Sequence, residues 1–138
     1  MLKVIEISKL AKEFVPGLAN YKIERIARTE SSKAATALTQ VRCETVGIKW
    51  YKWSTSEDAR VRSSHRHMDN VLIRWDNPPS PEQLIGEKSQ GFYNAGEIYN
   101  CRCVCLPIVN LNQVKFHAKI YINGQIQRIS KKNFERLI

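Results

Sequence analysis

The hydrophobic pattern of the sequence changes at Gly47, and this change limits the fold more than any other feature. Before Gly47, apolar and small residues recur at helical spacing from Ile23 to Val41. After Gly47, the chain continues in short β-branched and aromatic runs, of which Ile48–Trp53 is the first. Helices therefore come first and strands second, which is typical of the α+β class rather than of alternating βαβ units.

The first part of the chain is expected to form two helices. An amphipathic segment runs from Leu2 to Phe14 and is stopped by Pro16-Gly17. A longer helix is expected to begin at Asn20 as its N-cap and to end near Gly47. Its apolar or small positions are Ile23, Ile26, Ala27, Ala34, Ala37, Leu38 and Val41.

The end of the chain carries a clear hairpin signal. Asn123-Gly124 is the favoured type I′ turn, and it separates the alternating segments Ala118–Ile122 and Gln125–Ile129. Ser130 is then expected to cap a short terminal helix. A β-hairpin followed by a short helix is therefore predicted.

The middle of the chain is expected to be less regular. Ser54 to Asp69 is predicted as a polar loop, and Val71–Ile73 as a short apolar strand. The stretch from Asp76 to Gly96 is rich in Pro and Gly and is predicted as a long irregular excursion that is either functional or mobile. Cys101 to Val109 is predicted as a buried strand.

Together these elements predict N-terminal helices packed on a small, mostly antiparallel sheet, with a C-terminal hairpin and helix. The expected organisation is a domain over residues 1–110 and a hairpin-helix appendage over residues 111–138.

Charge and apolar content narrow the classes of partner. The chain has 22 Lys and Arg against 13 Asp and Glu, a formal net charge of +9, which favours a polyanion or an acidic protein surface as partner. No stretch approaches the roughly 20 apolar residues of a membrane span, and no signal peptide is expected. Reduced thiols are therefore expected for the four cysteines.

A polar segment between the first two predicted strands holds Arg60, Arg62, His65, Arg66 and His67. The arginines can bind phosphate or carboxylate, and the two histidines can act as general acid and base in RNA cleavage. The histidines can also contribute to a metal site. In the alternative interpretation, Asp58 pairs with Arg60 or Arg62 and fixes a loop in which the histidines are partly buried.

Cys101, Cys103 and Cys105 alternate, so a strand would place them on one face. They can pack as small apolar side chains, form a redox pair, or join His65 in a zinc site.

Two further groups are open to a binding or a structural interpretation. Trp50, Tyr51 and Trp53 can stack on bases or fill the core. Lys119, Lys131 and Lys132 belong to a basic set near the C-terminus that can contact nucleic acid or a protein partner, or lie in solvent.

Several motifs occur in one order. Arg28-Thr29-Glu30 precedes Trp50, and the Asp58–His65 segment precedes Asn100-Cys101-Arg102-Cys103. In this order and spacing they resemble the phage Mu F-like head morphogenesis family, the minor head proteins of tailed phages, over roughly residues 20 to 107. Many members carry Cys-x-x-Cys where this chain has Arg62 and His65. Of a metal site in such members, only His65, Cys101 and Cys103 remain here.

The resemblance implies a structural protein of the phage head that acts in head morphogenesis and DNA packaging, with no enzymatic activity and no cofactor. It implies the portal or the major capsid protein as partner, packaged double-stranded DNA as a further one, several copies in an assembly and no membrane. The expected location is the virion, assembled in the host cytoplasm. Kinship of the family with small RNase-like toxin folds implies the alternative, a nuclease that uses Arg60, Arg62, His65 and His67.

Overall fold

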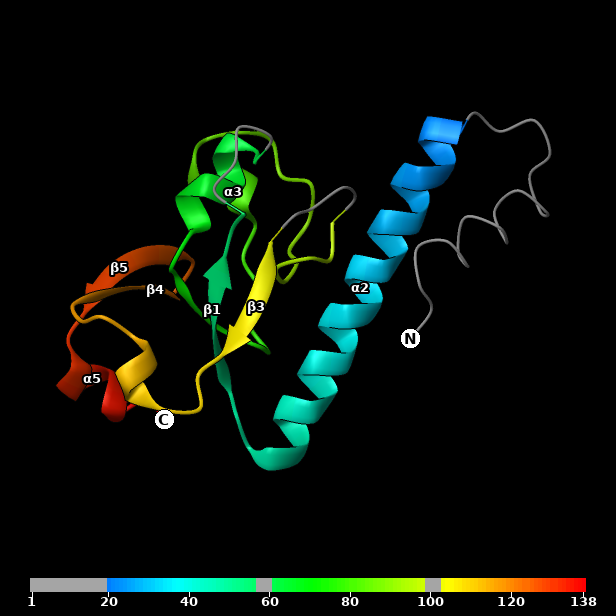
Figure 1. Cartoon of the computed structure of the whole chain (residues 1–138). Coiled ribbons are helices and arrows are strands. Elements are labelled where there is room, and N and C mark those ends of the chain that lie inside the picture. Colours follow the sequence, from blue (N-terminus) through cyan, green and yellow to red (C-terminus); the bar gives the residue numbers. More distant parts are fainter. Residues whose placement is uncertain (1–19, 57–60, 99–102) are drawn as a thin grey trace.

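A long helix packs against one face of a five-stranded sheet in the computed structural model of the chain (Figure 1). The structure describes residues 20–56, 61–98 and 103–138. The helical elements are α2 (Asn20–Val46), α3 (Ser63–Met68), α4 (Pro81–Leu84), the 3-10 turn η1 (Leu111–Gln113) and α5 (Lys131–Glu135). The strands are β1 (Trp50–Ser54), β2 (Leu72–Arg74), β3 (Val104–Pro107), β4 (Ala118–Ile122) and β5 (Gln125–Ile129). The predicted α+β class is confirmed.

The sheet has the strand order β3-β1-β2-β4-β5. All neighbouring strands are antiparallel except β2 and β4, which run parallel with Leu72 opposite Ile120. The C-terminal hairpin thus extends the same sheet to which β1 and β2 belong.

Each face of the sheet has its own apolar core. Tyr51, Trp53 and Ile73 lie on the face covered by α2 and by the segment before β3. Trp50 lies on the opposite face, where its ring meets Phe134 of α5 edge-on at a centroid distance of 5.4 Å. Trp50, Tyr51 and Trp53 are at most 5% exposed, so their rings form core and do not offer a surface for stacking on bases.

The hairpin and its cap follow local sequence signals. Asn123 (φ 54°) and Gly124 (φ 75°) both adopt the left-handed conformation that a type I′ turn requires. The Asn133 backbone N–H donates to the Ser130 side-chain oxygen over 3.3 Å at the start of α5. Both predictions are confirmed.

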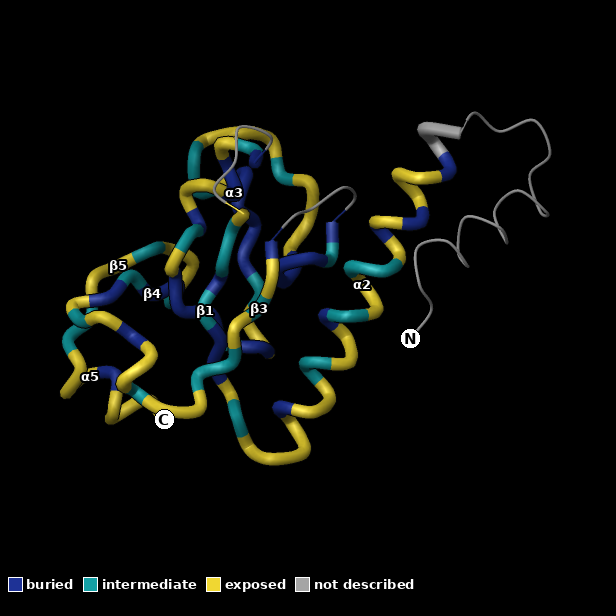
Figure 2. The backbone as a smooth tube through the Cα atoms, in the orientation of Figure 1, coloured by how far each residue is buried: buried dark blue, intermediate teal, exposed yellow. Residues whose placement is uncertain are grey.

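Helix α2 buries only part of the side that its apolar residues indicate, because Ile23 and Ala27 are buried as expected but other predicted positions are not. Ile26, Leu38 and Val41 are 42%, 40% and 58% exposed, and the outward side of α2 is open to solvent (Figure 2). The side that meets the rest of the protein carries Thr36 and Cys43 instead. A close contact explains this choice, because the Thr36 hydroxyl donates a 2.7 Å hydrogen bond to the Ala95 carbonyl.

Two expectations for the middle of the chain are wrong. Part of the predicted loop from Ser54 to Asp69 forms α3, because Val61, Ser64 and Met68 recur at helical spacing and become buried. The strand expected to be buried over Cys101 to Val109 is an edge strand, β3, in which Val104 is 53% exposed. An edge strand with one covered face leaves alternate side chains in solvent.

The predicted helix from Leu2 to Phe14 lies outside the described residues. No helix in residues 20–56, 61–98 and 103–138 is long and apolar enough to span a lipid bilayer.

Candidate functional site

The most enclosed group of polar side chains is centred on His65, on the inward side of α3. Its side chain is only 2% exposed. The ring of Trp53 meets the imidazole edge-on at a centroid distance of 5.6 Å. The helical turn of α3 directs His65 inward, and Trp53 of β1 packs against its ring. His65 therefore lies in the protein interior rather than on a surface loop.

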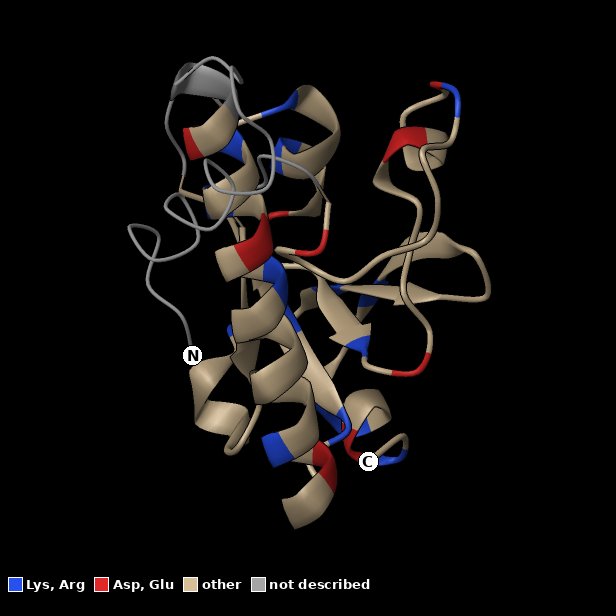
Figure 3. Ribbon diagram, turned by 90° about the vertical axis from the view of Figure 1, so that its right-hand side faces the viewer, with Lys and Arg blue, Asp and Glu red and all other residues tan. Residues whose placement is uncertain are grey.

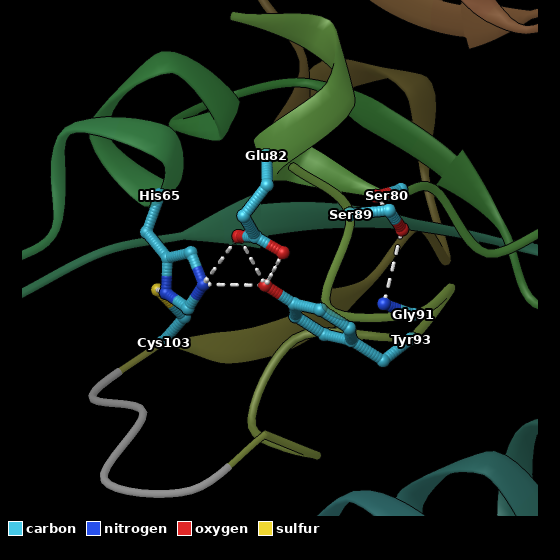
Figure 4. A network of polar contacts seen from close by, with 7 residues as sticks. All are labelled: His65, Ser80, Glu82, Ser89, Gly91, Tyr93 and Cys103. Atoms are coloured by element: carbon cyan, nitrogen blue, oxygen red, sulfur yellow. Dashed lines mark hydrogen bonds and ion pairs between the residues drawn. The ribbon is translucent and has the colours of Figure 1, made fainter. Parts of the chain in front are cut away.

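Tyr93 and Glu82 complete this group from the irregular excursion between β2 and β3 (Figure 4). The Tyr93 hydroxyl lies 2.8 Å from His65 Nε2 and donates to the Glu82 carboxyl group, whose oxygens are 3.0 and 2.8 Å away. Glu82 is 2% exposed, and its Oε2 lies 3.9 Å from His65 Nε2. A buried carboxyl group with such partners avoids the desolvation cost that an isolated one would carry.

The single proton of the Tyr93 hydroxyl fixes the direction of the remaining contacts. Because this proton goes to Glu82, the Tyr93 oxygen accepts from His65, and Nε2 carries the imidazole proton. The other ring nitrogen, Nδ1, lies 3.6 Å from the sulfur of Cys103. We call these four side chains, Cys103, His65, Tyr93 and Glu82, the buried network.

The excursion that supplies Glu82 and Tyr93 is held by its own hydrogen bonds. The Ser80 and Ser89 hydroxyls are 2.9 Å apart, and the Gly91 N–H donates to Ser89 (Figure 4). The Tyr93 N–H donates to the Pro79 carbonyl over 2.9 Å. The predicted irregular excursion is therefore ordered, and it fastens α4 to the sheet.

A second polar contact links the excursion to β1 and α2. The Tyr51 hydroxyl donates to Asn94 Oδ1 over 2.9 Å and accepts from the Ala95 N–H. Burial of the phenol raises the pKa of Tyr51 well above its ordinary value of 10.0. Tyr51 therefore stays neutral at physiological pH and serves as a fixed hydrogen-bonding group.

The two candidate catalytic histidines do not face each other. His65 points into the core, whereas His67, two residues further along α3, is exposed together with Arg66. Arg62 is half-buried just before α3. Arg60 and Asp58 lie outside the described residues.

The candidate zinc ligands are brought together in part. Cys103 and His65 are in contact, whereas Cys101 lies outside the described residues. Within the described ranges, no three His, Cys, Asp or Glu side chains are grouped so that they could hold a metal ion. A structural zinc site needs four ligands, so zinc at His65, Cys101 and Cys103 stays a prediction.

The remaining predicted positions are dispersed. Arg28 and Glu30 are exposed on α2, where Glu30 forms an exposed ion pair with Lys33 at 3.5 Å. Lys119 is half-buried on β4, and Lys131 and Lys132 are exposed on α5. Figure 3 shows Lys and Arg spread over the helix, the sheet and the C-terminal part.

The other motif residues show no exposed site in the part of the chain that the structure describes. Asn100 and Arg102 lie outside the described residues, and Trp50 and Cys103 are core residues.

Glu82 and Tyr93 are the site residues that the sequence analysis missed. Each is a single polar or aromatic residue in a Pro- and Gly-rich stretch, far along the chain from His65. The only signal for them was the length of that stretch, which predicted a functional or mobile excursion but named no residue.

Comparison with known proteins places this geometry in a wider context. The family described as phage Mu protein F like protein matches residues 5–106. An uncharacterized protein of Haemophilus influenzae is 43% identical over 88 residues, which is 64% of this chain and 17% of that protein. The chain therefore spans a small part of the length of this relative. No solved structure gives a significant match.

Proposed function

Because the chain belongs to the phage Mu protein F like family, we propose that it is a minor head protein that acts in head morphogenesis and DNA packaging, at the portal or the inner capsid surface. The family is related to phage heads, and its members are generally structural rather than enzymatic. The observation that carries the proposal is the match over residues 5–106, which includes α2, the buried network and β3.

The buried network supports a structural role. A general acid or base must come within hydrogen-bond reach of its substrate. His65 is 2% exposed and is held by Tyr93 and Cys103, so it joins α3 to the excursion and to the residue that precedes β3. The nuclease alternative, with Arg60, Arg62, His65 and His67, gains no support from this arrangement.

The open side of α2 supports a place in an assembly. Ile26, Leu38 and Val41 are exposed, and Leu38 and Val41 are one helical turn apart. Adjacent apolar side chains exposed on a helix are typical of surfaces that meet other proteins.

The test is the composition of phage particles. Virions and procapsids of the phage that encodes this chain are purified, treated with nuclease and protease to remove adhering material, and analysed by mass spectrometry. We expect the chain inside both particles and in complex with the portal after mild disruption. Its absence from both particles would sink the proposal.

The enzymatic alternative is tested on the same protein. We expect no cleavage of RNA or DNA above a buffer control. Cleavage that is lost in His67→Ala, the exposed histidine, would favour the nuclease instead.

A further inference from the structure

A hollow of about 540 Å³ lies at the end of the sheet where the parallel strands β2 and β4 begin. The cationic side chains that line it come from three separate segments and are Lys52, Lys115, Lys119 and Arg128. His117 and Asn70 line it as well. We call it the basic hollow, and it is separate from the buried network.

The basic hollow has no acidic counterpart. Among the described residues that line it, none is Asp or Glu. The ion pairs found among the described residues join side chains outside the hollow, such as Arg74 with Asp76 at 2.7 Å. The positive charge of the hollow is therefore available to an external anion.

One contact inside the hollow is unfavourable without such an anion. Lys119 of β4 and Arg128 of β5 stand directly opposite each other in the antiparallel pair, on the same face. Like charges at directly opposed positions destabilise a sheet. Arg128 is held in place by a hydrogen bond from its Nη1 to the His117 carbonyl at 3.3 Å. A bound anion would relieve this repulsion.

We propose that the basic hollow binds the phosphate backbone of double-stranded DNA. Lys and Arg neutralise phosphates without reading the sequence, and side chains from several segments can follow a backbone that passes over an open hollow. This inference deepens the proposed function, since packaged DNA fills the head in which the protein would lie. It assigns the contact to Lys52, Lys115, Lys119 and Arg128 rather than to Lys131 and Lys132, which do not line the hollow.

The test measures binding of a short fluorescent duplex to the full chain between roughly 50 and 200 mM salt. The double variant Lys115→Gln/Lys119→Gln removes two charges from the hollow. We expect its affinity to fall by about tenfold or more at low salt and its salt slope to decrease by about 2, since each phosphate contact contributes about 0.9. Duplexes of different sequence are expected to bind equally.

The matched control is Lys49→Gln/Lys88→Gln, which removes the same charge from two exposed lysines outside the hollow. We expect it to bind DNA nearly as the wild type does. Equal weakening by both double variants would mean that net charge alone matters and would overturn the proposal. Displacement of the duplex by millimolar mononucleotide would overturn it in favour of a small-ligand site.

A stability measurement separates loss of the site from loss of the fold. We expect Lys119→Gln to unfold at the same or a higher urea concentration than the wild type while binding DNA more weakly. Unchanged DNA binding in folded Lys115→Gln/Lys119→Gln protein would overturn the basic hollow but not the head-protein proposal, which depends on the content of virions.

Discussion

Tyr93 is the residue on which the buried network depends. Its hydroxyl contacts both His65 and Glu82, so one oxygen bridges these two buried groups. Removing the hydroxyl takes one hydrogen-bond partner from each of two buried polar groups. The free-energy cost of a buried polar group that has lost a partner exceeds the net stabilisation that the hydrogen bond had provided.

We therefore expect Tyr93→Phe to lower the free energy of unfolding by about 2–3 kcal/mol. Urea denaturation followed by circular dichroism measures the change. Phe92→Leu, at a neighbouring side chain that is 61% exposed, is the control and should change stability by less than about 0.5 kcal/mol. A Tyr93→Phe protein as stable as this control would contradict a structural role for the network.

Tyr51 predicts how stability depends on alkaline pH. Its pKa is raised in the folded protein by burial, whereas the unfolded chain ionises near 10.0. The folded state therefore holds the proton more tightly, and the stabilisation is complete below pH 10 and is lost as the pH rises above it. Burial also raises the pKa of Tyr121 and of the Cys43 thiol, so the loss begins near pH 9.0, the ordinary value for Cys.

We expect the unfolding free energy of the wild type to fall above pH 10 about 1.4 kcal/mol per pH unit more steeply than that of Tyr51→Phe. Urea titrations at several alkaline pH values measure both slopes. Tyr51→Phe should be less stable than the wild type at neutral pH, because the hydrogen bond to Asn94 is lost. Parallel curves for the two proteins would show that Tyr51 does not carry the effect.

At the scale of elements, α2 and the excursion approach each other closely at Gly96. A Cβ atom added there would lie 2.5 Å from Thr36 Oγ1 and 3.2 Å from the Cys103 carbonyl oxygen, and Gly96 has φ +86°. Gly86 has a similar φ of +80° but no atom within 4 Å of such a Cβ. The two glycines therefore separate backbone strain from crowding.

We expect Gly96→Ala to destabilise the protein by about 3 kcal/mol, since strain and overpacking add. Gly86→Ala should cost only the backbone strain, about 1 kcal/mol. The comparison uses urea midpoints of the two variants. Equal costs would mean that α2 does not approach the excursion as closely as described.

The elements that could be predicted from the sequence are those set by nearby residues. Asn123-Gly124 fixes its own turn, and Ser130 fixes the start of α5, so neither needs the rest of the chain. The buried side of α2 could be predicted only at Ile23 and Ala27, because further along the helix a hydrogen bond from Thr36 to a distant carbonyl buries Thr36 instead of the more apolar Leu38.

Of the buried network, the sequence indicated two residues and missed the other two. His65 stood out by composition and Cys103 by alternation, and the structure brings these two into contact. Glu82 and Tyr93 reach His65 only through the path of the excursion, which no periodicity describes. The basic hollow likewise combines β1, β4 and β5, whose register depends on the whole sheet.

At the scale of the whole molecule, the C-terminal part is joined to the rest through a shared core. Phe134 of α5 packs against Trp50, and Ile120 of β4 lies opposite Leu72 of β2. Trp50 and Leu72 belong to the N-terminal part, so removal of residues 111–138 would uncover both of them.

A chain of residues 1–110 is therefore expected to lack a cooperative unfolding transition. Thermal circular dichroism in the near and far ultraviolet measures this. The control is a chain that ends at Glu135, which loses only exposed residues such as Ile138 and should keep its transition. Cooperative unfolding of residues 1–110 would instead support the predicted boundary between the domain and its appendage.

The parallel pairing of β2 with β4 has a consequence for the order in which the protein is completed on the ribosome. Leu72 pairs only with Ile120 on this side, so β2 leaves the exit tunnel with one edge that has no strand to bind until 48 further residues have been synthesised. Such non-local pairing is slow, and an open apolar edge can recruit another chain in the meantime. Synthesis of the hairpin therefore ends the interval in which the edge of β2 is open to pairing with another chain.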